Sequence, residues 1–168
     1  MKIIDSLFRK LELQMLMNLT ARALDKPVKR IWTLPNSKAL QVYAEYTCEH
    51  LACSKNWTLM QQMNDEAYRV GKRLRKIFHL RKPTDITRFT FWLYRNIGIQ
   101  MEGNIPGKIC VTECFFSHHY TPAICRVASA LDDGIIKGLA GDGILHFQQR
   151  ITEGCQYCLA TFKTSEEI

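Results

Sequence analysis

The chain has 168 residues, of which 46% are hydrophobic and 23% are charged, so its size and composition are those of one compact domain. These values exclude a wholly disordered chain, and no apolar run reaches the length that a membrane-spanning helix needs. The net charge of +7 is uneven, because residues 1–84 contain sixteen Lys and Arg against seven Asp and Glu, whereas residues 85–168 contain seven against nine.

The start of the chain and the cysteine count bear on the cellular compartment. Charged residues interrupt the apolar residues of the first segment, which therefore lacks the continuous apolar centre of a secretion signal. Seven cysteines are too few for a small disulfide scaffold, and an odd number leaves at least one unpaired. The sequence predicts a cytoplasmic protein whose cysteines are thiols.

Four amphipathic helices are predicted in the first hundred residues. Apolar residues recur at helical spacing in four segments, at 3–20, 36–53, 58–79 and 84–97. Asn36 and Ser37 are candidate caps for the second helix, and Thr84 or Asp85 for the fourth. Gly98 supplies the left-handed residue that ends the fourth helix.

A basic run from Arg69 to Lys82 lies in the third predicted helix and contains seven Lys and Arg with no acid. Such a run is able to contact nucleic-acid phosphates or an anionic membrane surface. Apolar residues at helical spacing through the same segment favour a helix with one buried stripe, whose basic residues face water: Leu59, Met63, Ala67, Val70, Leu74, Ile77 and Phe78. No nucleic-acid-reading motif accompanies the run.

The last third of the chain changes to a mixed pattern. After a turn at 104–107, residues 108–116 are rich in β-formers and predict a strand. Thr121 and Pro122 predict the start of a helix, which glycines 138, 141 and 143 are expected to end. Residues 144–151 and 156–162 predict two further strands, joined by a hairpin at Glu153-Gly154.

These elements predict a single α+β domain over residues 1–168, in which N-terminal helices pack on a small antiparallel C-terminal sheet with one inserted helix. Its parts are an N-terminal helix and connection (1–35), a helical part (36–100) and a strand-helix-strand-strand part (105–163). The expected partner is a small-molecule substrate or ligand, with a homo-oligomer as a further expectation. The sequence favours neither a membrane nor nucleic acid as a partner.

Metal ligands are one interpretation of the cysteines in the last third. Thiolate and imidazole groups are preferred by zinc and iron. Cys155 and Cys158 form a C-x-x-C pair, and Cys114 and Cys125 are the candidate thiols that would complete a set of four. On a regular strand the paired cysteines would point to opposite faces. The alternative is that the cysteines pack as small hydrophobic residues.

Nucleophilic catalysis is the other interpretation. Cys114 ends the predicted strand 108–116 and lies four residues before His118. His118 or His119 would move the proton, and the helix beginning at Pro122 would lower the pKa of the thiol. The alternative for the two histidines is a solvated loop.

Charged residues near these cysteines complete the candidate site. Asp132 could orient a histidine or bind a cationic group, although a solvated helix face is the alternative for at least one of Asp132 and Asp133. Arg150 is a candidate carboxylate clamp, because its planar fork matches a carboxylate, or else an exposed strand residue. Arg126 is the second candidate for substrate binding. The three glycines do not match a phosphate-binding loop.

The order of Cys114, a loop, Cys125-Arg126 opening a helix with acids, a strand with an arginine, and Gly154-x-x-x-Cys158 resembles the L-2-amino-thiazoline-4-carboxylic acid hydrolase-like family. The resemblance covers about residues 36–163. It implies hydrolytic opening of a thiazoline ring, or a related reaction on another small acid, with the three cysteines at the family's cysteine positions.

Two departures from that family pattern concern the charged residues. The family has an Asp soon after the second cysteine, whereas Asp132 is the first here, and Arg150 and Thr152 lie closer to Gly154. A closing pattern of Gly, Cys and an aromatic is also similar to vinyl-reductase-like small-molecule-binding domains. The sequence thus leaves two functions open, a hydrolase acting on a cyclic amidine-like C–N bond and a non-catalytic domain that binds or senses a small molecule or metal.

Overall fold

The computed structural model describes residues 2–52 and 57–165, and it has the predicted α+β fold. Its helices and strands follow one another in the order α1 (Lys2–Leu24), α2 (Asn36–Leu51), α3 (Trp57–Ile77), α4 (Pro83–Asn96), β1 (Ile99–Gly103), β2 (Gly107–Cys114), α5 (Pro122–Ala140), β3 (Gly143–Gln149) and β4 (Cys158–Thr164). Short 3-10 helices follow β2, at Phe115–His118, and β3, at Ile151–Glu153.

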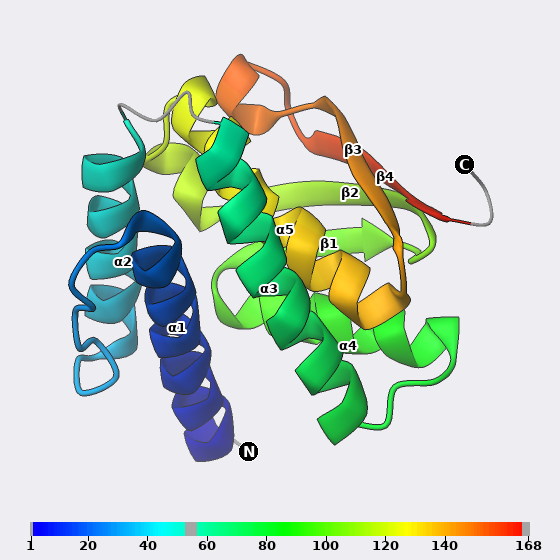
Figure 1. Cartoon of the computed structure of the whole chain (residues 1–168), viewed down its shortest axis with the longest axis horizontal. Helices are drawn as coiled ribbons and strands as arrows, with labels where there is room; N and C mark the ends of the chain where they lie inside the picture. Colours follow the sequence, from blue (N-terminus) through cyan, green and yellow to red (C-terminus); the bar gives the residue numbers. More distant parts are fainter. Residues whose placement is uncertain (1, 53–56, 166–168) are drawn as a thin grey trace.

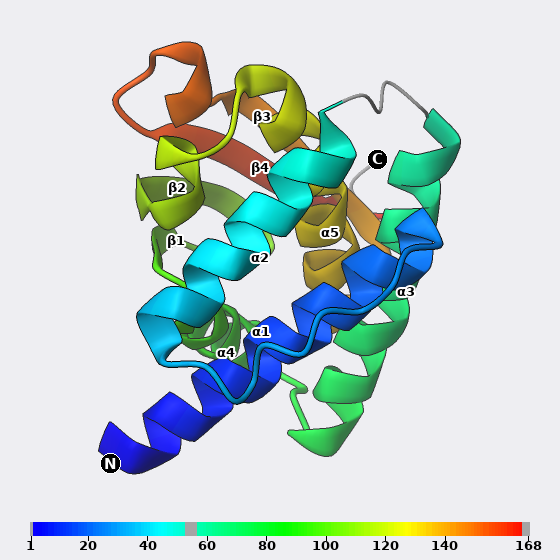
Figure 2. The same ribbon diagram turned by 90° about the vertical axis from the view of Figure 1, so that its left-hand side faces the viewer.

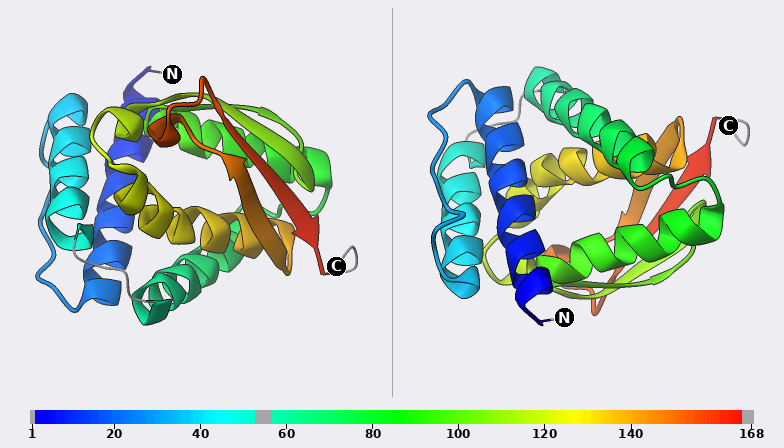
Figure 3. Two further views of the ribbon diagram at one scale, coloured as in Figure 1. Left: turned by 90° about the horizontal axis from the view of Figure 1, so that it is seen from above. Right: turned by 90° about the horizontal axis from the view of Figure 1, so that it is seen from below.

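Helix α5 lies at the centre of the molecule (Figure 1). Helices α1 and α2 lie side by side at one end, away from the sheet (Figure 2). Helix α3 packs closely against α5. The views from above and below show the sheet at the other end, with α4 beside β1 (Figure 3). None of the helices in the described ranges is long and apolar enough to cross a membrane.

The sheet has the order β1-β2-β4-β3, and every neighbouring pair is antiparallel. Its buried side chains lie on one face, as the pairing of Ile109 with Ala160 and of Leu145 with Phe162 shows. This inner face packs toward α5 and α4, while the outer face carries mainly polar, exposed residues. The core joins residues from α1 through β4 in one cluster.

The helices of the first hundred residues lie where the periodicity predicts them, but the expected side-chain caps of α2 and α4 are wrong. Asn36 already belongs to α2, and Pro35 occupies the N-cap position without a capping bond. Likewise α4 begins at Pro83 after Lys82, one residue before Thr84. Proline in the first turn loses no hydrogen bond, so α4 can begin without a side-chain cap. The second predicted helix extended to Cys53, which lies outside the described residues.

The second half of the chain adds one element that the sequence pattern does not predict. Strand β1 pairs with β2 over Ile99–Gly103, a short segment whose polar residues and glycine hide a strand pattern. By contrast, the predicted start of α5 is confirmed, because the Thr121 hydroxyl accepts a hydrogen bond from the Ile124 N–H at 3.3 Å. Gly98 ends α4 with a φ of 79°, as expected.

Helices α3 and α5 cross so closely that glycine is required on both. A Cβ atom at Gly138 would lie 2.8 Å from the Gly71 Cα, and one at Gly134 would lie 2.7 Å from the Ala67 Cβ. Gly138 therefore lies inside α5 as a packing residue, and the prediction that it helps to end the helix is wrong.

The basic face of α3 is exposed, as its pattern predicts. Leu59, Met63 and Ala67 form the buried stripe of the helix. Ile77 and Phe78 were expected in the same stripe, but they are 66% and 40% exposed, since α3 ends there and extends past the core.

Candidate functional site

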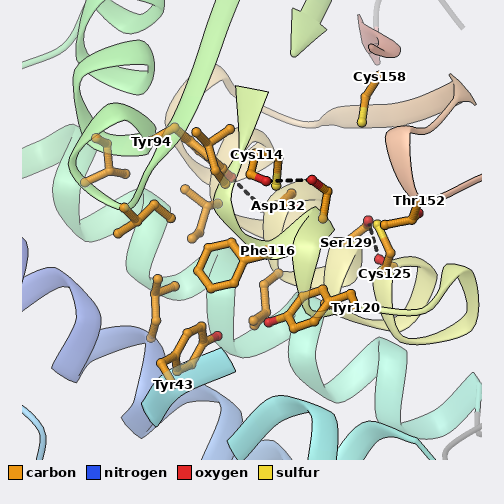
Figure 4. A pocket seen from close by; sticks show the side chains of 18 of the residues that line it. Tyr43, Tyr94, Cys114, Phe116, Tyr120, Cys125, Ser129, Asp132, Thr152 and Cys158 are labelled. Carbon is orange, nitrogen blue, oxygen red and sulfur yellow. Dashed lines mark hydrogen bonds between the residues drawn. The ribbon is translucent and has the colours of Figure 1, made fainter. Parts of the chain in front are cut away.

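Two adjoining cavities, of about 90 and about 60 Å³, lie between the inner face of the sheet, α5 and α4. Both are lined by Tyr94, Ile99, Cys114, Cys125, Ser129, Asp132 and Cys158. The larger cavity extends to α1 and α2, where Tyr43, Phe116 and Tyr120 form an aromatic wall (Figure 4). Three thiols and one carboxyl that are distant in the sequence therefore meet around one interior space.

A bulge in β2 turns Cys114 toward this space. The pairing with β1 skips Thr112, because Val111 and Glu113 pair with consecutive residues of β1. Val111 is buried, whereas both Thr112 and Glu113 are exposed. Strict alternation from Val111 would send the Cys114 side chain outward, so the extra residue places the thiol on the cavity wall.

A second bulge acts in the same way on Arg150. The pairing of β3 with β4 skips Gln148, because Phe147 and Gln149 pair with consecutive residues of β4. The sequence alternation groups Arg150 with the outward-facing residues, but the extra residue turns it to the smaller cavity. There its Nη1 donates to the Ser129 hydroxyl at 2.6 Å, and its guanidinium lies 3.9 Å from the centre of the Phe147 ring.

Helical spacing on α5 supplies the opposite wall. Cys125, Ser129 and Asp132 follow one another at intervals of four and three residues, so they lie on one face of the helix. Pro122 and the Thr121 cap fix where α5 begins, and thereby which of its residues lie opposite the sheet. These three residues of α5 thus line the cavities.

Asp132 lies on the wall that the two cavities share. The Tyr94 hydroxyl donates to its Oδ1 at 2.9 Å, and no described residue bonds its Oδ2. Burial raises the pKa of Asp132 to about 6, although the Tyr94 bond and the charge of Arg150 lower it in part and Asp133 adds a further rise. A carboxyl with this pKa is able to give or take a proton near neutral pH.

Glu12 on α1 brings a second carboxyl to the larger cavity, and it is not among the residues that we predict for the site. The residue is 7% exposed, and burial raises its pKa more than the neighbouring Asn96 and Arg9 lower it. Among the described residues, no group bonds its Oε2 atom. Burial raises the pKa of the Tyr94 hydroxyl most, and the charges of Asp132 and Glu12 raise it further, so the hydroxyl lies within the field of both carboxyls.

The structure does not join Cys114 to a histidine. His118 and His119 are exposed and line neither cavity, because the 3-10 turn directs Phe116 inward and the two histidines outward. Burial raises the pKa of Cys114 to about 12, more than the N–H groups of Ser117 and Phe116 lower it. The structure therefore does not bring an imidazole to the Cys114 thiol at the cavities.

The four-cysteine metal set is not assembled either. In the described ranges, no group of three or more His, Cys, Asp and Glu side chains is placed to hold a metal ion. Cys155 lies in the connection before β4 and lines neither cavity, while the Cys158 sulfur accepts the Ile151 N–H at 3.3 Å. The thiols at the cavities are instead partners of backbone groups and of Arg150, which lies 3.8 Å from the Cys125 sulfur.

The remaining charged candidates separate into two roles. Arg126 points to the surface, where its Nε and Nη2 atoms bond Glu153 at 2.9 and 2.7 Å, so the prediction that it binds substrate is not supported by either interior cavity. Asp133 joins three elements, because it accepts the Leu145 N–H at 2.7 Å and a bond from the Asn64 amide. Asp132 and Asp133 are both half-buried, so neither is a fully solvated residue of the helix.

Comparison of the sequence with protein-family models and with curated proteins found no match. The fold and the site together define an α+β protein with a carboxyl-bearing interior cavity.

Proposed function

We propose that this chain binds a small organic molecule in the two interior cavities, with Asp132 as the polar anchor. The observation that carries the proposal is the Asp132 carboxyl, which lines two otherwise largely apolar cavities and accepts only the Tyr94 hydroxyl among the described residues. A donor on a bound molecule would add a hydrogen bond to this charged group, which contributes about 1.5–3 kcal/mol. Apolar walls with a few placed polar groups are typical of small-molecule sites.

The charges around the cavities favour a particular kind of ligand. Asp132 and Glu12 both present unbonded carboxyl oxygens, which suit an amine, amidine or hydroxyl donor. Arg150 lies at the smaller cavity and suits a carboxylate. A molecule with an amidine at one end and a carboxylate at the other matches both walls, and this is the substrate chemistry that the family resemblance implies.

Hydrolysis is the second candidate function, and the pKa of Asp132 favours it. With a pKa of about 6, Asp132 is largely ionised at pH 7 and can take a proton from a water molecule that attacks the amidine carbon. The carbon–nitrogen bond then breaks, and the same proton passes to the leaving nitrogen. Cys114, with a pKa of about 12, would line the site as a neutral thiol.

The free thiols also bear on the compartment. The six cysteines of the described ranges are unpaired, which supports our proposal of a reducing, cytoplasmic environment.

A matched ligand series tests the proposal. We would titrate the protein with L-2-amino-thiazoline-4-carboxylate and with 2-amino-thiazoline, which lacks the carboxylate, and follow binding by calorimetry and turnover by NMR. Asp132→Asn should weaken both ligands about tenfold or more, whereas Arg150→Gln should weaken only the carboxylate. Glu153→Gln on the surface is the control and should change neither.

Three results would separate the candidates. Binding without turnover supports a binding domain, and turnover that Asp132→Asn abolishes supports the hydrolase. Absence of saturable binding by either ligand contradicts the ligand chemistry proposed for both.

A further inference from the structure

A second concave site lies between the C-terminal halves of α3 and α5 and the segment that follows α3. This basic cleft has a volume of about 510 Å³. Five cationic side chains and one histidine line it: Lys72, Arg75, Lys76, His79, Arg81 and Lys137. Asp142 is the acid on its wall.

The close crossing of the two helices brings these cations together. Gly71 and Gly138 let the helix backbones touch, and Gly138 itself forms part of the cleft wall. Lys72 follows the first glycine and Lys137 precedes the second, so their ammonium groups approach from different helices. They lie 5.2 and 5.5 Å from the centre of the same Tyr68 ring.

Protein acids leave the charge of the cleft largely uncompensated. Within the described ranges, none of its five Lys and Arg side chains forms an ion pair. The Asp142 Oδ1 accepts a hydrogen bond from the neutral Tyr68 hydroxyl at 2.8 Å. Arg75 uses its Nε to donate to the Leu80 carbonyl at 3.3 Å, which leaves its outer nitrogens for another acceptor.

His79 adds an uncommon backbone conformation at the edge of the cleft. Its φ of 51° lies in the left-handed region, where α3 ends and the Leu80 N–H returns to the Arg75 carbonyl at 3.0 Å. Glycine usually takes this position, and a side chain there costs about 1 kcal/mol. Here the residue contributes an imidazole to the lining of the cleft.

Helix dipoles account for only part of this arrangement. Cations in the last turn of a helix are stabilised by its negative end, which explains Arg75 and Lys76 on α3 and Lys137 on α5. The dipoles do not explain Lys72, which lies earlier in α3, or Arg81, which lies beyond it. They also do not explain why all five cations border one hollow.

We propose that the basic cleft binds a small molecule that carries two or more phosphate groups, at a site separate from the interior cavities. Ammonium and guanidinium groups are the usual partners of phosphate oxygens, and one carboxylate would leave most of the five cations unpaired. The volume is that of a small-molecule pocket. Nucleic acid would need cations spread along an open face, whereas these converge on one concavity.

Calorimetric titration of the full chain with inorganic pyrophosphate, at constant ionic strength, tests this proposal. We expect saturable binding to one site. Lys72→Gln combined with Lys137→Gln should weaken binding about tenfold or more, because two charge-assisted contacts are lost. The control pair, Lys26→Gln with Lys38→Gln, removes the same charge from exposed positions outside the cleft and should change affinity less than about twofold.

The other outcomes are decisive as well. Absence of saturable pyrophosphate binding, or equal weakening by the control pair, would overturn the proposal. So would binding only to vesicles of anionic phospholipid or only to a short DNA duplex, because each of these indicates an open surface. If the first double variant fails to fold, Lys76→Gln with Arg81→Gln on the exposed rim makes the same test.

Discussion

The two sides of α5 are packed in opposite ways. Toward α3, glycines bring the backbones into contact, and a Cβ atom at Gly134 would lie 2.3 Å from the Asn64 carbonyl oxygen. Toward the sheet, Cys125, Ser129 and Asp132 line the two interior cavities. The close packing against α3 fixes the position of α5, so the cavities on the sheet side can stay open. The side of α5 that packs on α3 thus serves stability, whereas the side that faces the sheet supplies the candidate binding residues.

The largest effect that we expect concerns Cys114, across the cavity from α5. Burial raises the pKa of this thiol from 9.0 to about 12. The thiolate is the reactive form, so iodoacetamide should label Cys114 about a thousandfold more slowly than it labels free cysteine at pH 7.5. Peptide mapping by mass spectrometry measures this rate, with Cys114→Ser identifying the peptide. A rate equal to or above that of free cysteine would restore Cys114 as a nucleophile.

Alanine at Gly134, which packs against α3, should lower the free energy of unfolding more than alanine at Gly154, which has open space around it. Gly134→Ala forces a methyl group against the α3 backbone and should lower the free energy of unfolding by about 3 kcal/mol. Gly154→Ala is the control, since its φ is 89° but no atom lies within 4 Å of the added carbon, and about 1 kcal/mol is expected. Denaturant unfolding compares the two. Equal losses would mean that the crossing is not close-packed.

Replacing Asp132 or the adjacent Asp133 by asparagine should change the free energy of unfolding in opposite directions at pH 8. The folded protein raises the pKa of Asp132 from 3.8 to about 6, so it binds this proton more tightly than the unfolded chain does. That stabilisation is complete below the ordinary pKa and is lost as the pH rises through about 6. Asp132→Asn removes this dependence, and at pH 8 it should raise the free energy of unfolding by up to about 3 kcal/mol relative to the unchanged protein.

Asp133→Asn is the matched variant. It replaces an oxygen that accepts the Asn64 amide with a group of the wrong polarity, so it should destabilise by about 1–3 kcal/mol at pH 8. Unfolding measured at several pH values between 4 and 8 gives both results. If both variants shift stability in the same direction at pH 8, Asp132 does not carry a buried charge.

Local patterns in the sequence predict most of the fold and only part of the site. Helical periodicity identifies α1 to α5, and the Thr121-Pro122 pair places the start of α5 to the residue. Spacing along α5 also explains why Asp132 and Cys125 line the same cavities. These features depend on residues close in the chain, so the sequence displays them directly.

The inward positions of Cys114 and Arg150 depend on long-range pairing. Each is turned by a bulge whose extra residue is defined only against the partner strand, and strict alternation gives the wrong face for both. Glu12 reaches the cavity from α1, more than a hundred residues away from Asp132 in the chain. No local motif marks such a residue, although an acid inside the apolar stripe of a helix is a signal that could have identified it.

The smallest change in stability is expected for a larger side chain at the wall of the larger cavity. Ala128 lines the larger cavity, and Ala128→Leu adds three carbon atoms at its wall. Because space is present, the free energy of unfolding should change by less than about 1 kcal/mol, while binding of 2-amino-thiazoline should fall about tenfold or more. Unfolding and calorimetry on the same preparation measure both quantities. Unchanged binding would place the ligand outside this cavity.

The proton affinity of Asp132 tests the interior site most directly. Carbon-detected NMR can follow the Asp132 carboxyl through a pH titration, with and without saturating 2-amino-thiazoline. Because burial sets the pKa in the free protein, we predict a midpoint near pH 6, and a bound cationic amidine should move it to lower pH by favouring the ionised carboxyl. A midpoint near the ordinary value of 3.8, or one that the ligand leaves unchanged, would contradict a ligand anchored at Asp132.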